Sequence, residues 1–81
     1  MSDPLQALPE VKDGRHQLLG AKIRSLRKDR VLTLRRLANK TEFSVSPISQ
    51  IELGKNAASV STLCKLASAL GVAVGVFFED I

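Results

Sequence analysis

The segment LRRLANKTEFSVSPISQIELG, residues 34–54, constrains the fold more than any other part of this 81-residue chain. Apolar residues at helical spacing occupy both of its halves: Leu34, Leu37 and Ala38, then Ile48 and Ile51. Helices this short are unstable alone, so each must bury its apolar face against the other. The small side chain of Ala38 lets the two cross closely. The sequence therefore predicts two short helices joined by a tight turn, which is a helix-turn-helix.

The second of these helices is expected to begin at about Val45. Ser44 is suited to accept a hydrogen bond from a free backbone N–H in the first turn, and Pro47 falls where its missing N–H costs nothing. The outward positions of this helix are small or polar, with hydroxyl and amide groups that can reach base edges. These positions are Val45, Ser46, Ser49 and Gln50.

Three more helices are expected around this pair. The first spans about residues 16–30, the fourth runs from a cap at Ser59 or Ser61 to Gly71, and a short fifth lies near residues 74–79. The fold class is thus all-α, a compact bundle of about five short helices. We expect this domain to occupy residues 15–81, preceded by a flexible arm, residues 1–14, that has two prolines and little periodicity.

The charge distribution favours a polyanionic partner. The formal net charge is +4, but residues 15–65 hold eleven basic and three acidic residues, which is a net +8. The alternative is that these side chains only solvate a helical surface. Tyr and Trp are absent, so the chain offers no aromatic platform of those residues for single-stranded nucleic acid.

No catalytic set is evident. His16 has no metal-ligating or orienting neighbour in the sequence, and GAKIRS lacks the spacing of a nucleotide-binding loop. Cys64 is the only cysteine and is expected to be a small core residue rather than a reactive thiol. No segment reaches the roughly 20 apolar residues of a membrane span, and no signal peptide is visible. We expect a cytoplasmic non-enzyme without cofactor or metal.

Residues 19–72 resemble the DNA-binding domain of the phage-repressor, Cro and xenobiotic-response-element (XRE) family of bacterial regulators. The resemblance is carried by the Leu37-Ala38 pair, by S-x-I-S-x-I-E-x-G at residues 46–54, and by TLxKLAxALGV at residues 62–72. It implies a lambda-repressor-like fold and a sequence-specific regulator of double-stranded DNA in a bacterial or phage system, located at the nucleoid. It also implies a dimer on a two-fold operator, with the recognition helix, about residues 45–53, in the major groove.

The resemblance implies one structural ion pair in this chain. Basic and polar residues near the motif are also expected to contact phosphates. Arg27 and Glu52 match a pair that joins the first and third helices in the family. The chain departs from the pattern at Glu42, where glycine is usual, and at Leu34, where many members have a phosphate-binding glutamine. Phosphate contacts are expected from Thr33, Arg24, Lys28, Arg35, Arg36, Lys40, Lys55 and Asn56.

Dimerisation is expected through the uncharged segment VAVGVFF, residues 72–78, because the basic surface repels its own copy. The interface residues would be Val74, Val76, Phe77 and Phe78. In the alternative, both phenylalanines complete the monomer core.

Three regulatory roles stay open: a free-standing repressor such as a restriction-modification controller, an antitoxin, or part of a longer regulator. The sequence especially resembles regulators with a C-terminal cupin sensor domain, which would be missing here. A protein-interaction module that has lost DNA binding is the alternative from another class, supported only by the two departures.

Overall fold

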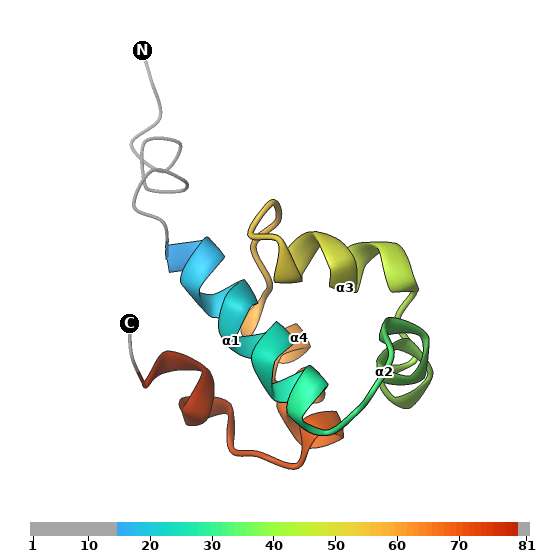
Figure 1. Ribbon diagram of the computed structural model, residues 1–81. Coiled ribbons are helices and arrows are strands. Elements are labelled where there is room, and N and C mark those ends of the chain that lie inside the picture. Colours follow the sequence, from blue (N-terminus) through green and yellow to red (C-terminus); the bar gives the residue numbers. More distant parts are fainter. Residues whose placement is uncertain (1–14, 80–81) are drawn as a thin grey trace.

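The computed structural model describes residues 15–79, which form an all-α bundle (Figure 1). The α-helices are α1 (Arg15–Asp29), α2 (Leu34–Thr41), α3 (Val45–Glu52) and α4 (Val60–Leu70). A short 3₁₀ helix, η3 (Val74–Phe78), follows them. The all-α class and the helix-turn-helix are confirmed. The predicted arm, residues 1–14, lies outside the described residues.

The expected short fifth helix is present as a 3₁₀ helix, so the described residues contain four α-helices and one 3₁₀ helix. The N–H of Val76 donates to the carbonyl of Ala73 at 3.0 Å, which is the i to i+3 pattern of a 3₁₀ turn. Gly75 and the β-branched residues on either side of it are poor α-helix formers. Five residues also leave little length for α-helical bonds to accumulate.

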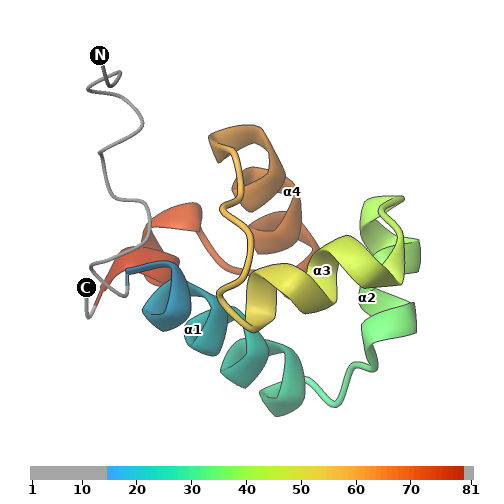
Figure 2. The ribbon, with the colours of Figure 1, turned by 90° about the horizontal axis from the view of Figure 1, so that it is seen from above.

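The core is aliphatic with one aromatic ring. Every helix contributes to the set of side chains that are fully buried: Ile23, Leu37, Ile48, Leu66, Leu70 and Phe77. Helix α1 packs against α3 and against η3, and Figures 1 and 2 show these two elements on different sides of it. Helix α2 packs against α3 and α4. The helix-turn-helix therefore rests on α1 and α4.

The helix caps follow the sequence at two positions and differ at a third. Thr33 accepts a hydrogen bond from the N–H of Arg36 at 3.0 Å, and Ser59 accepts one from Thr62 at 3.1 Å. Ser44 has the backbone of an N-cap, but its side chain makes no capping hydrogen bond. The prediction for Ser44 was wrong because the third position of α3 is Pro47, which has no N–H to donate.

The turn between α2 and α3 tolerates a residue other than glycine. Glu42 is left-handed, with φ 64° and ψ 20°, as its place in the family's turn implied. Such a conformation costs an L-residue about 1–2 kcal/mol. The buried Thr41 offsets part of this cost, because its hydroxyl donates to the carbonyl of Leu37 at 2.9 Å and accepts from the N–H of Phe43 at 3.3 Å.

Cys64 is exposed, so its expected place in the core was wrong. The buried stripe of α4 consists of Leu63, Leu66, Ala67 and Leu70. Cys64 follows Leu63 directly and is turned about 100° away from it by the helix. One residue of displacement is enough to move the thiol to the surface.

Gly20 marks the closest approach between α1 and α3. A Cβ atom at this position would overlap the carbonyl oxygen of Ile51 and lie 2.6 Å from that of Glu52. Both oxygens belong to backbone at the end of α3, which cannot rotate away as a side chain can. Only glycine lets α1 lie this close to the end of α3.

We predict that Gly20→Ala lowers the free energy of unfolding by about 2–3 kcal/mol, because overpacking against backbone forces the helices apart. Urea unfolding followed by circular dichroism measures the change. Gly75→Ala is the matched control, since a Cβ there meets no atom within 4 Å. Equal stability of the two variants would contradict the close approach.

Candidate nucleic-acid interface

Helix α3 presents one face to the core and the other to the outside. Ile48, Ile51 and Glu52 are buried. Of the four residues expected to read bases, Val45 and Ser46 are exposed, and Ser49 and Gln50 are half-buried. Ser46, Ser49 and Gln50 turn away from the core, whereas Val45 begins the helix at the border of the buried side, three residues before Ile48. Figure 1 shows α3 along one edge of the bundle.

Arg27 and Glu52 form a buried, bidentate ion pair that holds the end of α3 against α1. Arg27 Nε lies 2.7 Å from Glu52 Oε2, and Nη2 lies 3.1 Å from Oε1. Only 8% of Arg27 and 7% of Glu52 are exposed. Arg27 Nη1 also donates to the carbonyl of Leu32 at 2.7 Å, so the same guanidinium holds the connection between α1 and α2.

The start of α2 is suited to hold a phosphate. The N–H groups of Leu34 and Arg35 lie in the first turn, where the helix supplies no acceptor. Thr33 is exposed, and its hydroxyl can still donate while it accepts from Arg36. The side chains of Arg35 and Arg36 are exposed beside this helix end.

The remaining residues predicted to contact phosphate form two groups near α3. One further residue, Lys40, lies away from both groups. Arg24 and Lys28 of α1 share a surface hollow with Glu52 at the end of α3. Lys55 and Asn56 are exposed in the loop that follows α3. Lys40 stands apart, in the last turn of α2 next to α4.

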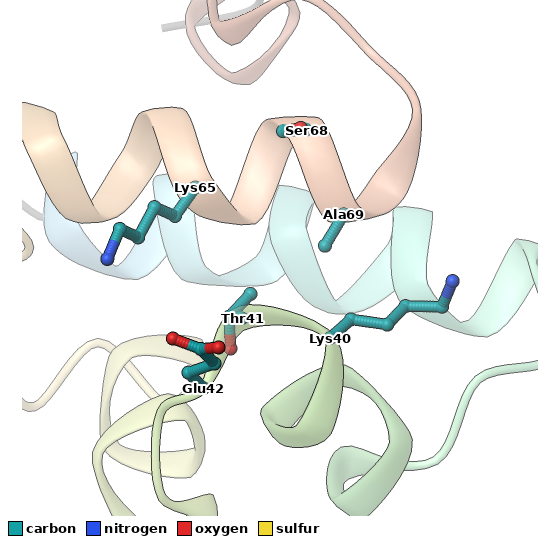
Figure 3. Close-up of a pocket in the computed structure, with 6 residues that line it drawn as sticks. All are labelled: Lys40, Thr41, Glu42, Lys65, Ser68 and Ala69. Carbon is teal, nitrogen blue, oxygen red and sulfur yellow. The ribbon is translucent and has the colours of Figure 1, made fainter.

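The hollow that contains Lys40 does not concentrate positive charge. It is lined by Lys40, Thr41, Glu42, Lys65, Ser68 and Ala69. Figure 3 shows the ammonium groups of the two lysines pointing toward opposite ends of the hollow. Lys65 Nζ lies 5.5 Å from the centre of the Phe43 ring, a cation–π contact. This arrangement has no convergent donors for a small anion.

The segment expected to form a dimer interface is divided between core and surface. Phe77 is fully buried, so its ring cannot contact a second copy, and that part of the prediction was wrong. Phe78 is 48% exposed, and Val74 and Val76 are half-buried. Neighbouring residues of a helix point in different directions, which places one ring inside and the other outside.

Sequence reasoning did not single out Gly20 or Leu53. Gly20 makes the close approach described above, and Leu53 follows α3 with 52% of its surface exposed. The sequence signal for Leu53 was its position, one helical turn after Ser49 and therefore on the outer face. Among residues 15–79, no three His, Cys, Asp or Glu side chains gather as a metal site requires, and no helix is long and apolar enough to cross a membrane.

Comparisons with known proteins agree with this fold. The family model for a helix-turn-helix domain matches residues 18–76. The clp gene regulator ClgR from C. glutamicum superposes with a TM-score of 0.76 at 34% identity, covering 79% of this chain and 83% of that one. The restriction-modification controller protein C.AhdI from Aeromonas hydrophila gives 0.76 at 27% identity, covering 78% and 96%. An HTH_3 family transcriptional regulator from Vibrio cholerae gives 0.75 at 32% identity, covering 80% and 36%. A search of curated protein sequences gives no match.

We predict that Arg27→Met and Glu52→Leu each lower the free energy of unfolding by about 3 kcal/mol or more, because each leaves a buried charge unpaired. The double variant should lose much less than the sum of the two. It should still lose about 1 kcal/mol, because the carbonyl of Leu32 no longer has its donor. A double-mutant cycle in urea measures these terms, and additive losses below about 0.5 kcal/mol each would contradict the buried pair.

Proposed function

Because this chain belongs to the helix-turn-helix family of the phage-repressor, Cro and XRE type, we propose that it is a sequence-specific regulator that binds double-stranded DNA as a dimer. The observation that carries the proposal is the outer face of α3, which turns the polar side chains of Ser46, Ser49 and Gln50 away from the core while the inner face is held by the Arg27–Glu52 pair. A short, rigidly held helix with such a face matches the shape and chemistry of a major groove. The protein would act at the bacterial nucleoid.

The four side chains predicted from the sequence to read bases lie in the first two turns of α3. The Gln50 amide can pair with N6 and N7 of adenine, Ser46 can bond several base edges, and Val45 can contact a thymine methyl. Ser49 and Gln50 are both half-buried, and Ser49 has the shorter side chain, so it contributes less. These side chains reach a few base pairs only, since eight residues of helix span about 12 Å.

Phosphate contacts fix the register of α3 in the groove. The start of α2 provides N–H groups and Thr33, and basic or polar side chains surround the recognition helix. We assign this role to Arg24, Lys28, Arg35, Arg36, Lys55 and Asn56, with Lys40 at the outer end of α2.

A dimer doubles the contact that one short recognition helix can make. An uncharged surface is formed by the exposed Phe78 with the half-buried Val74 and Val76 of η3. Two basic faces repel each other, so association through this uncharged segment leaves both recognition helices free for DNA.

We predict steeply salt-dependent binding, because about four to six phosphate contacts per protomer release counterions and make the log–log slope several units negative. Fluorescence titration of a random duplex at two salt concentrations measures the slope. A slope near zero on every duplex would favour a protein-interaction module instead.

Two variants separate base reading from phosphate contact. Gln50→Ala should cost about 1–3 kcal/mol on a duplex selected from a random pool and almost nothing on random DNA, whereas Arg36→Ala should weaken both.

We predict that Phe78→Lys shifts the chain toward monomer, because a charge replaces the apolar ring at the proposed interface. Sedimentation at tens of micromolar protein measures the shift. Leu53→Lys is matched in exposure, 52% against 48%, and should leave the association unchanged. A wild-type monomer throughout, or a dimer indifferent to Phe78→Lys, would remove η3 from the interface.

A further inference from the structure

Leu53 is a large apolar side chain that residues 15–79 leave about half exposed. It is 52% exposed and does not belong to the residues packed against the core. Its backbone, with φ −82° and ψ −4°, continues the turn of α3, and its N–H donates to the carbonyl of Ser49 at 3.0 Å. The side chain therefore extends the helix surface by one position.

The helical turn places Leu53 on the outer face of α3. It lies four residues after Ser49 and three after Gln50, the spacings that bring side chains together on one side of a helix. The buried residues of α3 lie on the other side. An apolar group thus stands at the far end of the surface proposed to face the DNA bases.

We propose that Leu53 is a specificity-determining residue that contacts the C5 methyl group of a thymine in the major groove; this rests on the proposed function. The thymine methyl is the apolar group that base edges present in that groove. If Leu53 instead packed against a polar base edge or a phosphate, that group would lose its water and gain no hydrogen bond in return.

The spacing along α3 defines where this thymine lies. Val45 and Leu53 are eight residues apart, or about 12 Å along the helix axis. Bases follow one another by about 3.4 Å along a strand. The two apolar ends of the face therefore contact positions about three to four base steps apart, and Ser46, Ser49 and Gln50 read the bases between them.

The end of α3 is held firmly enough for such a contact. At Gly20, α1 lies in close contact with the backbone carbonyls of Ile51 and Glu52. The ion pair with Arg27 holds Glu52, the residue before Leu53. Leu53 therefore starts from a fixed backbone and does not have to be ordered by binding. Contact with a methyl group requires this positioning, because dispersion forces decline steeply with distance.

Replacement of thymine by deoxyuridine tests the contact, because it removes the methyl and leaves base pairing intact. A duplex selected from a random pool is substituted at each thymine in turn, and affinity is measured for the wild type, Leu53→Ala, Val45→Ala and Leu18→Ala. For the wild type, one substitution near the Leu53 end should weaken binding about threefold to fivefold, the effect of one methyl contact. Leu53→Ala should abolish that loss and keep the loss at the Val45 end.

The controls separate this contact from folding and from DNA binding in general. Leu18→Ala removes the same side chain at similar exposure, 54%, from α1 and should keep the wild-type uridine profile. Leu53→Met should also keep it, because the apolar contact survives. A uridine profile that is identical in Leu53→Ala and the wild type overturns the assignment while salt-dependent DNA binding persists. A wild type that binds no duplex overturns the proposed function and this inference with it.

Discussion

The Arg27–Glu52 ion pair is the interaction on which the arrangement of the motif depends. One guanidinium joins α1 to the last residue of α3 and to the connection that begins α2. A buried charge is expensive unless its hydrogen bonds are complete, so this arrangement favours one relative position of the three elements over its alternatives. Gly20 adds a steric condition to the electrostatic one, since α1 can lie against the end of α3 only without a side chain at that position.

Positions of local strain lie in the connections before and after α2. Val31 and Glu42 are the residues other than glycine that have positive φ within residues 15–79. Each costs about 1–2 kcal/mol. Hydrogen bonds offset the strain on each side: Arg27 holds the carbonyl of Leu32, and Thr41 bonds to both sides of the turn before α3. The strain is therefore balanced by the same contacts that orient the motif.

The open face of α3 follows from this support. The inner face is held at Glu52 and buried at Ile48 and Ile51, so within residues 15–79 the position of α3 is fixed from its inner side. The surface they form changes character along the helix, from apolar at Val45 through polar at Ser46 and Gln50 to apolar at Leu53. This alternation of apolar and polar side chains along α3 can match a DNA groove that presents methyl groups and hydrogen-bonding base edges in the same order.

The sequence alone determined the helices of the motif, their starts at Leu34 and Val45, and the division of α3 into an inner and an outer face. Helical periodicity and turn residues act within a few positions, so they can be recognised without the fold. The Arg27–Glu52 pair was available only through resemblance to a family, because nothing local links residues 25 positions apart. Only the tertiary structure showed that Gly20 is required where α1 meets the end of α3. It alone also showed that Cys64 and Leu53 are exposed and that Phe77 is buried beside an exposed Phe78. These features depend on which backbone or side chain comes close from elsewhere in the chain, and that is a property of packing rather than of local pattern.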